Sequence, residues 1–282
     1  LGFLTKSLQV FLVLPALGLV WLACADTTVR RRLLGALAGL GALLATAGWW
    51  VAVVEVVPAS LRPYVGGSQG DSFLELTFGY NGLGRLDGSE VGRVGGGGGP
   101  FSGDVGILRL FGSTLGGQIS WLLPAALLLL LSGLWMRGTA PRTDARRAAY
   151  LVFGGWLVVT ALVFSLMQGI FHEYYTVALA PAIAALVGMG AGEAWERRHE
   201  ARGAIVLSAA SAVTAVWGFA LLSRTTEYGD WLRLTVLGVG LAAAFLLLVV
   251  DRLHRRAVTA VAVAAIAAGL LGPAAWSAST PA

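Results

Sequence analysis

The sequence has a single cysteine and few charged side chains, and each shortage excludes a class of protein. Because Cys24 stands alone, an intrachain disulfide and a cysteine-based metal cluster are excluded within these 282 residues. Charged residues make up 12% of the chain and hydrophobic residues 57%. A soluble domain has about a quarter of its residues charged. The composition therefore predicts an all-α polytopic membrane protein.

Charges are also scarce inside the predicted membrane spans. Arg233 lies at the boundary of a span, and Glu55 lies where the chain leaves one. Proton- and ion-coupled transporters usually need charged groups within the membrane, so this shortage disfavours that class. The net charge of +5 is explained by basic loops and does not indicate a nucleic-acid partner.

The first residues differ from a usual protein start. Residues 1–6 read Leu-Gly-Phe-Leu-Thr-Lys and lack the basic start and small-residue cleavage site of a signal peptide. The first residue is Leu, and residues 1–4 resemble the end of an apolar segment. We therefore expect the sequence to be a fragment of a longer chain.

Eight apolar segments reach or come within one residue of the roughly 17–25 residues that a membrane-spanning helix needs. They are 7–25, 33–54, 119–135, 149–167, 174–192, 204–222, 232–250 and 257–272. Two helices in 1–54 are thus followed by a long polar loop over 55–118. Six helices in 119–272 and a tail over 273–282 complete the predicted organisation.

Basic residues alternate between the two sides of the predicted spans. Thirteen of the 20 basic residues follow the first, third, fifth and seventh spans, in the connections 30–32, 137–147, 197–202 and 252–256. The positive-inside rule places these connections in the cytoplasm. We therefore expect a multi-pass plasma-membrane protein in the lipid bilayer, with both termini and the 55–118 loop extracytoplasmic.

The 55–118 loop is predicted to contain short interfacial helices and a glycine-rich segment. Ser72 and Glu75 have the spacing of a capping box, which starts a helix, and Asn81-Gly82 marks a turn after it. The run Gly95–Gly99 suggests a phosphate-binding loop, but no Lys-Ser or Lys-Thr follows it. A flexible linker is the simpler interpretation of the five glycines.

A second candidate site is the short connection between the fourth and fifth spans, which contains His172, Glu173, Tyr174 and Tyr175. These side chains suit a lipid headgroup, a metal or a sugar at the membrane edge. A tight turn with ordinary interfacial aromatic residues explains them equally well. His172 and Glu173 alone are too small a set to define a metal site.

Four cations are expected on the same outer side, namely Lys6, Arg62, Arg85 and Arg109. Cations there can hold a lipid phosphate through charge-assisted hydrogen bonds. Snorkelling of each side chain toward lipid headgroups is the alternative, and it needs no specific ligand.

Three separated runs resemble a known family. They lie at 65–99, which includes Phe78-Gly79-Tyr80-Asn81-Gly82-Leu83-Gly84-Arg85, and at 115–124 and 171–182. In this order, and together with Thr5-Lys6, they resemble actinobacterial members of glycosyltransferase family 39. These proteins are similar to protein O-mannosyltransferases and aminoarabinose transferases. The resemblance runs through most of the chain and identifies it with the C-terminal membrane half, a GT-C-like membrane region.

The resemblance implies an enzyme that takes a mannose-like hexose from a polyprenyl-phosphate donor. It transfers the hexose to a protein, lipid or cell-wall acceptor outside the cytoplasm. The family's general base is a carboxylate of the first outer loop, usually in an Asp-Glu pair, and a base must reach the proton that it takes. No adjacent Asp-Glu pair occurs in this sequence. The catalytic residues are therefore expected upstream of Leu1, and this chain alone is not expected to turn over.

Within this chain, the resemblance implies substrate-binding residues. Lys6 and Arg85 would neutralise the phosphate leaving group, where charge grows in the transition state. The sugar or acceptor pocket would be lined by Tyr80, Asn81, His172, Glu173, Tyr174 and Tyr175. No cofactor is certain, and a divalent metal stays an option.

Two other classes of function fit the same residues. A non-catalytic carrier or flippase for lipid-linked glycans would use the same outer cavity but would need no carboxylate base. A structural membrane scaffold would tolerate substitution of Lys6 or His172 without loss of activity.

Overall fold

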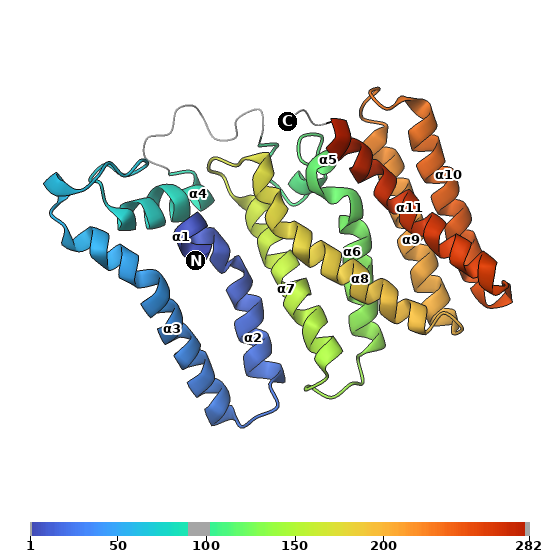
Figure 1. Cartoon of the computed structure of the whole chain (residues 1–282), viewed down its shortest axis with the longest axis horizontal. Helices are drawn as coiled ribbons and strands as arrows, with labels where there is room; N and C mark the ends of the chain where they lie inside the picture. Colours follow the sequence, from blue (N-terminus) through green and yellow to red (C-terminus); the bar gives the residue numbers. More distant parts are fainter. Residues whose placement is uncertain (1, 90–101, 280–282) are drawn as a thin grey trace. The chain divides into compact units, whose positions relative to one another are not determined.

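The computed structural model describes residues 2–89 and 102–279, and every regular element in these ranges is a helix (Figure 1). Eight helices there are long and apolar enough to cross a membrane. They extend over Gly2–Cys24, Val29–Val56, Gly116–Met136, Ala145–Leu166, Glu173–Glu196, Ala201–Leu222, Gly229–Leu248 and Arg255–Ser279. The predicted all-α polytopic fold with eight spans is thereby confirmed. The predicted glycine linker, Gly95–Gly99, lies outside the described residues.

The chain forms two units. Unit 1 comprises Leu1–Arg109 and Pro141–Tyr175, and unit 2 comprises Leu110–Ala140 and Thr176–Ala282. The first, second and fourth spans belong to unit 1. The other five belong to unit 2, except that the fifth begins with three residues of unit 1.

The first span, in unit 1, is a broken helix. It consists of α1 (Gly2–Lys6), the 3-10 helix η1 (Ser7–Val13) and α2 (Leu14–Cys24). Pro15 lies in the first turn of α2. An amide hydrogen at this position would have no partner within the helix, so the lack of one in proline costs no hydrogen bond. Its ring would clash with the carbonyl of residue 11 in a continuous α-helix, so the α-helix restarts at Leu14.

Close helix packing holds α2 against α7 (Ala145–Leu166). A Cβ added to Gly155 of α7 would lie 2.7 Å from the Cβ of Ala16 of α2. A larger residue would therefore separate these two helices, as is typical where helices pack through small residues in lipid.

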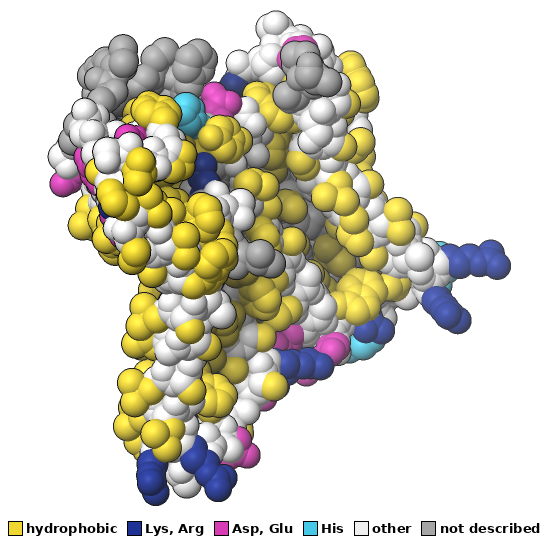
Figure 2. All heavy atoms as spheres, turned by 60° about the vertical axis from the view of Figure 1, so that its left-hand side comes forward, with side chains coloured by type: hydrophobic (Ala, Val, Ile, Leu, Met, Phe, Trp, Pro, Cys, Tyr) yellow, Lys and Arg dark blue, Asp and Glu magenta, His cyan; other side chains and the backbone are white. Residues whose placement is uncertain are grey.

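The second span, α3 (Val29–Val56), touches α2 near its N-terminal end. There Trp21 covers Gly35 and donates a hydrogen bond of 2.9 Å from its indole nitrogen to the carbonyl of Arg32. No residue of α3 is buried. Figure 2, in which the left-hand side of Figure 1 comes forward, shows hydrophobic side chains along this flank and basic side chains at its lower end. Such a surface suits contact with lipid.

After α3 and the 3-10 turn η2 (Ala59–Leu61), unit 1 contains a second irregular helix, over 73–87. Its larger part is the π-helix η3 (Glu75–Leu83), which α4 (Gly84–Asp87) continues. The predicted turn at Asn81-Gly82 corresponds to a kink. Gly82 has non-helical dihedral angles, φ −120° and ψ −114°, and divides this segment into two helical parts.

The predicted capping box at the start of this helix forms only in part. The Ser72 hydroxyl accepts a hydrogen bond of 3.1 Å from the amide of Glu75, as expected. The return bond from Glu75 to the Ser72 amide is not formed. The Glu75 carboxylate instead accepts from the Ser68 hydroxyl and from the amides of Gln69 and Gly70, closing the turn before the helix.

Unit 2 is built from regular helices. Its elements are α5 (Gly116–Ile119), the 3-10 turn η5 (Ser120–Leu122), α6 (Leu123–Met136), α8 (Ala180–Glu196), α9 (Ala201–Leu222), α10 (Gly229–Leu248), the 3-10 turn η7 (Val250–Arg252) and α11 (Arg255–Ser279). The 3-10 helices η4 (Arg109–Phe111) and η6 (Glu173–Leu179) lie at the boundaries between the units. In unit 2, α10 packs between α9 and α11, and α8 packs on α6.

The last helix is longer than the sequence suggests. The predicted span ends at residue 272 and a tail follows, whereas α11 continues through Pro273 to Ser279. Backbone groups in lipid must be satisfied within the segment, which favours continuing the helix. The proline costs one hydrogen bond, to the carbonyl of Gly269. Residues 280–282 of the predicted tail lie outside the described residues.

Candidate functional site

A cavity of about 270 Å³ lies within unit 1 and is called the unit 1 pocket. It is lined by the broken first span, by the 73–87 helix, by the end of α7 and by Tyr175. Four of the residues predicted to bind substrate line it, namely Lys6, Asn81, Arg85 and Tyr175. Residues far apart in the sequence therefore meet at one site.

The break in the first span faces this pocket. Ser7 is buried and has a left-handed backbone with φ 47°, which is unfavourable for a residue other than glycine. Non-helical backbone at membrane depth is tolerated only where it is buried in protein or lines a cavity. Strained backbone of this kind gathers at binding and catalytic sites. The broken helix and the pocket are thus consistent features of one site.

Lys6 is the only lysine of the chain and lies at this break. Its ammonium is 4.1 Å from the centre of the Tyr175 ring and 5.2 Å from that of Tyr174. Cation–π attraction at such distances holds a cation without neutralising it. Within 2–89 and 102–279, no carboxylate forms an ion pair with Lys6. The pocket therefore presents an uncompensated positive charge.

The residues around Lys6 form an aromatic group. The His172 ring stacks on Tyr174 with centres 5.5 Å apart and meets Tyr175 edge-on at 5.5 Å. Tyr174 and Tyr175 are perpendicular at 4.8 Å. Tyr175 is buried, and His172 and Tyr174 are exposed. Glu173 lies in the same segment but does not line the pocket.

Arg85 has a different environment from the one expected of a phosphate ligand. Its Nε donates to the carbonyl of Tyr80 at 3.0 Å and its Nη1 to that of Ile170 at 2.7 Å. The guanidinium also lies 4.6 Å from the centre of the Tyr80 ring. Arg85 therefore joins the 73–87 helix to the segment after α7, and Tyr80 contacts Arg85 without lining the pocket.

Sequence reasoning missed three polar residues of the pocket, namely Thr5, Ser7 and Gln9. Ser7 and Gln9 lie in the predicted first span, and Thr5 directly precedes Lys6 in the Thr5-Lys6 run but was not predicted to bind substrate. The signal that could have found them is the concentration of polar residues around Lys6, followed by Pro15 in an otherwise apolar stretch. A helix broken in this way leaves its polar groups facing protein or water.

The rest of the pocket wall is apolar. Leucine side chains from the first span and from the 73–87 helix face Val163, Phe164 and Met167 from the end of α7. The pocket thus has an amphipathic lining, with one cation, several hydroxyl and amide groups and a hydrocarbon wall.

Arg62 and Arg109, two of the four candidate cations, bind other groups of the protein outside the pocket. Arg62 pairs with Glu55 at 2.9 Å. Arg109 is buried and donates to the carbonyls of Phe164 and Met167, at the C-terminal end of α7. Burial lowers the pKa of Arg109 from its ordinary value. Neither arginine lines the pocket.

The described residues contain no group of three or more His, Cys, Asp or Glu side chains that could hold a metal ion. His172 and Glu173 are therefore a pair without further carboxylate, thiol or imidazole ligands in that part of the chain.

The fold and the pocket define a multi-pass membrane protein with an amphipathic, cationic cavity. The chain is a distant homologue of two proteins of Bacillus subtilis (strain 168). It is 30% identical to "Putative mannosyltransferase YycA" in an alignment of 367 positions, which covers 99% of this chain and 52% of the relative. It is 29% identical to "Putative mannosyltransferase YkcB" in an alignment of 370 positions, which covers 99% of this chain and 51% of that relative.

The chain therefore spans about half the length of the curated relatives it matches. The relation to mannosyltransferases agrees with the resemblance seen in the sequence. No family model matches the chain. No solved structure matches it.

Proposed function

We propose that the chain is the membrane half of a glycosyltransferase that moves a mannose-like hexose from a polyprenyl-phosphate donor to an extracytoplasmic protein, lipid or cell-wall acceptor. The observation that carries this proposal is the unit 1 pocket, where the ammonium of Lys6 lies beside an apolar wall. A polyprenyl phosphate has the matching chemistry, an anionic head on a hydrocarbon chain. The relation to mannosyltransferases supports the same class of reaction.

In this proposal Lys6 binds the donor phosphate. A charge-assisted hydrogen bond from an ammonium to a phosphate oxygen is about twice as strong as a neutral one. Negative charge on that phosphate grows as the bond to the sugar breaks, so Lys6 stabilises the transition state more than the bound donor. The rings of Tyr174 and Tyr175 hold the ammonium in place, and the first isoprene units lie against Phe164 and Met167.

The sugar would be bound by the polar side chains of the same pocket. Asn81 and Gln9 each carry an amide that both donates and accepts, which suits the hydroxyl groups of a hexose. The Tyr175 hydroxyl can join them. Arg85 then acts through the 73–87 helix that it fastens, with its guanidinium turned to the Tyr80 and Ile170 carbonyls.

A transferase also needs a general base for the acceptor hydroxyl. The described residues that line the pocket include no Asp or Glu. In our proposal the base is therefore supplied by a residue outside this lining.

The proposal is tested by sugar transfer in membranes that contain the protein of which this chain is part, with a labelled hexosyl polyprenyl phosphate. Replacing Lys6→Ala removes a hydrogen bond to a charged group, a loss of about 1.5–3 kcal/mol, and lowers transfer about 10- to 100-fold. Lys6→Arg keeps the charge and retains most of the activity. Undiminished transfer by Lys6→Ala at normal membrane insertion would contradict the role of Lys6.

The carrier or flippase is the second candidate, because the lining residues that the structure describes include no carboxylate. The same labelled donor separates the two functions. A transferase releases polyprenyl phosphate in proportion to the sugar transferred, whereas a carrier moves the intact donor across the bilayer and releases none.

A further inference from the structure

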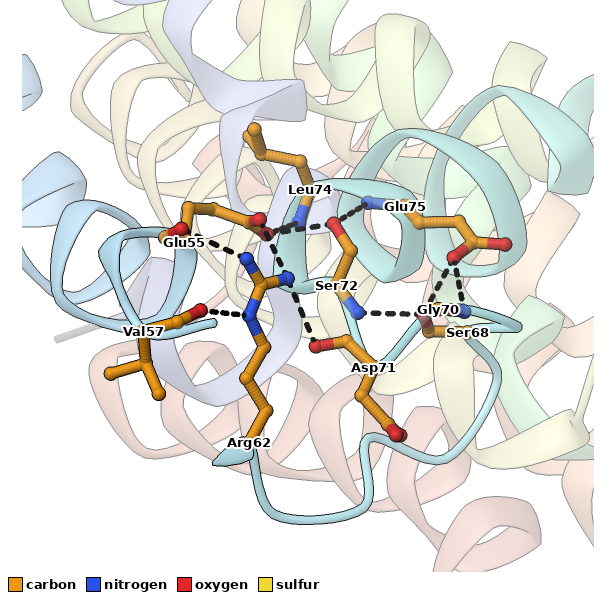
Figure 3. A network of polar contacts seen from close by, with 9 residues as sticks. All are labelled: Glu55, Val57, Arg62, Ser68, Gly70, Asp71, Ser72, Leu74 and Glu75. Atoms are coloured by element: carbon orange, nitrogen blue, oxygen red, sulfur yellow. Dashed lines mark hydrogen bonds and ion pairs between the residues drawn. The ribbon is translucent and has the colours of Figure 1, made fainter. Parts of the chain in front are cut away.

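Glu55, in the last turn of α3, is the centre of a polar network outside the pocket (Figure 3). Its Oε1 accepts hydrogen bonds from the Ser72 hydroxyl at 2.7 Å and from the Leu74 amide at 3.0 Å. Its Oε2 lies 2.9 Å from Nη1 of Arg62. One carboxylate thus joins α3, the loop after it and the start of the 73–87 helix.

Arg62 completes this junction. Its guanidinium donates to the carbonyls of Val57 at 2.7 Å, Glu55 at 2.8 Å and Asp71 at 3.4 Å. The side chains of Arg62 and Glu55 are only 11% and 23% exposed, so water screens this pair less than a surface ion pair. Figure 3 shows the guanidinium between the end of α3 and the residues that precede the 73–87 helix.

The Glu55 carboxylate acts on the N-terminus of that helix. The first amides of a helix have no partner within it, and here the Leu74 amide is satisfied by Glu55 and the Glu75 amide by Ser72. A negative charge at this end also interacts favourably with the helix dipole. Glu55, although it belongs to α3, thus fixes where the next helix begins.

The opposite end of the helix is fixed by the segment after α7. Besides the bond of Arg85 to Ile170, the amides of Gln168 and Gly169 donate to the carbonyls of Leu86 and Arg85. Asn81 lies between the two anchored ends of this helix. Both anchors therefore determine where the Asn81 side chain lies in the pocket.

The π-helical part of this helix makes an external anchor necessary. A π-helix is rare and occurs mostly as single turns at functional sites. Here it includes the kink at Gly82 and the buried Thr77, whose hydroxyl has no hydrogen-bond partner among residues 2–89 and 102–279. Hydrogen bonds within the helix alone therefore leave its position weakly determined.

The loop also contacts the helix beside the pocket. Gly67 has φ 88°, and a Cβ placed there would lie 2.9 Å from Cδ1 of the Tyr80 ring. The other neighbour of this ring is the Arg85 guanidinium. A displacement of the loop would thus reach Arg85 through Tyr80.

We propose that Glu55 is a positioning residue for the unit 1 pocket. It does not touch the ligand; through Ser72 and Leu74 it places the 73–87 helix, and with it Asn81 and Arg85, for binding of the anionic lipid. The inference rests on the proposed function, because its effect is measured as affinity for a polyprenyl phosphate.

The test uses the chain in lipid nanodiscs and a polyprenyl monophosphate as the probe. Glu55→Ala leaves the helix start without its carboxylate and weakens binding about tenfold. Glu55→Gln keeps an oxygen that accepts from Ser72 and Leu74, and it restores affinity to within about threefold of the wild type. Asp87→Asn is the matched control, because in the described part of the chain the Asp87 carboxylate accepts from the backbone and side chain of the neighbouring Ser89, and it binds as the wild type does.

A double variant distinguishes positioning from a general loss of stability. If Glu55 acts through Asn81, Glu55→Ala weakens binding much less in an Asn81→Ala background than in the wild type. Equal weakening in both backgrounds, or equal weakening by Glu55→Ala and Glu55→Gln, would overturn the proposal.

A ligand-free measurement keeps this inference separate from the proposed function. Glu55→Ala is expected to speed hydrogen exchange at the amides of residues 81–86, and unchanged exchange there contradicts the positioning role. If Lys6→Ala binds polyprenyl phosphate as the wild type does, the proposed function fails whatever the exchange shows. If Lys6→Ala loses binding and Glu55→Ala does not, only the role of Glu55 fails.

Discussion

The two units of this chain differ in how far their spans are buried inside the protein. In the span Gly116–Met136 of unit 2, half of an 18-residue apolar stretch is buried. In the span Val29–Val56 of unit 1, no residue of such a stretch is buried. Unit 2 has long α-helices around apolar clusters, with the 3-10 turn η5 inside the span Gly116–Met136, and unit 1 has a broken first span, a π-helix and a pocket. The pocket of unit 1 suits binding, and the apolar clusters of unit 2 suit support.

Each unit is held by contacts of its own, and in both units helices pack through small residues, as Gly155 of α7 does against Ala16 of α2 in unit 1. In unit 2, helices approach through small residues, as where Gly240 of α10 meets Ala215 of α9 and Gly190 of α8 meets Leu129 of α6. Arginine side chains also bond to backbone carbonyls in both units, as Arg32 does at Leu22 and Thr27 in unit 1 and Arg224 does at Gly112 in unit 2. Irregular backbone leaves carbonyls unpaired, and long cationic side chains satisfy them. Substitutions that damage one unit should therefore spare the other.

The largest effect on stability is expected at the ion-paired cluster of unit 2. The buried Glu193 of α8 lies 2.6 Å from Arg137 and 3.2 Å from Arg197. Glu193→Ala removes the ion pairs of Glu193 with both arginines and lowers the free energy of unfolding by about 2 kcal/mol. This is less than the cost at a fully buried pair, because both arginines are partly exposed.

The measurement is thermal unfolding in detergent, together with binding of polyprenyl phosphate. Glu193→Gln, which keeps the shape and loses the charge, is the control and should have an intermediate effect. A loss of binding larger than the loss of stability would show that the two units are not independent.

A smaller effect is expected where α9 and α10 pack. A Cβ at Gly240 would lie 2.4 Å from the Cβ of Ala215, so Gly240→Ala forces the helices apart and costs about 1–2 kcal/mol. The matched control is Gly39→Ala on α3, where nothing lies within 4 Å, and the better helix propensity of alanine applies. Unfolding temperatures in detergent should fall for the first variant and not for the second.

The smallest expected effect is that the stability of the turn at residues 68–70 in unit 1 depends on pH. Hydrogen bonds from Ser68, Gln69 and Gly70 lower the pKa of Glu75 from its ordinary value of 4.5. A carboxyl group with a lowered folded pKa stabilises the fold above the unfolded value, and this stabilisation is lost as the pH falls through the folded pKa. The turn at 68–70 should therefore open below pH 4.5.

Hydrogen exchange at residues 69 and 70, corrected for intrinsic rates, measures this opening. The Glu75→Gln variant should show no such pH dependence. A wild-type turn that stays equally protected as the pH falls would exclude the role assigned to Glu75.

The fold was predictable to a large extent from hydropathy alone. The eight spans follow from the length of the apolar runs, because lipid forces every such run into a helix. The interruptions were not predictable in the same way. The break at Ser7 depends on Pro15 and on packing against other segments, and the π-helix depends on anchors at Glu55 and Arg85, which come from tertiary structure.

The sequence predicted which residues line the candidate site better than it predicted what each side chain contacts there. Lys6, Asn81, Arg85 and Tyr175 were selected from polarity, position and resemblance, and the structure brings all four to one pocket. That Arg85 bonds to carbonyls, and that Gln9 lines the pocket, depends on side-chain geometry that spacing does not reveal. The assigned binding roles stay predictions.

The most direct test of the central claim is the affinity of the chain in nanodiscs for a polyprenyl monophosphate, compared between the wild type and Lys6→Ala. The account predicts saturable binding by the wild type, a dissociation constant at least about tenfold higher for Lys6→Ala, and near-normal binding for Lys6→Arg. Equal dissociation constants for the wild type and Lys6→Ala would contradict the claim that the unit 1 pocket binds the lipid phosphate.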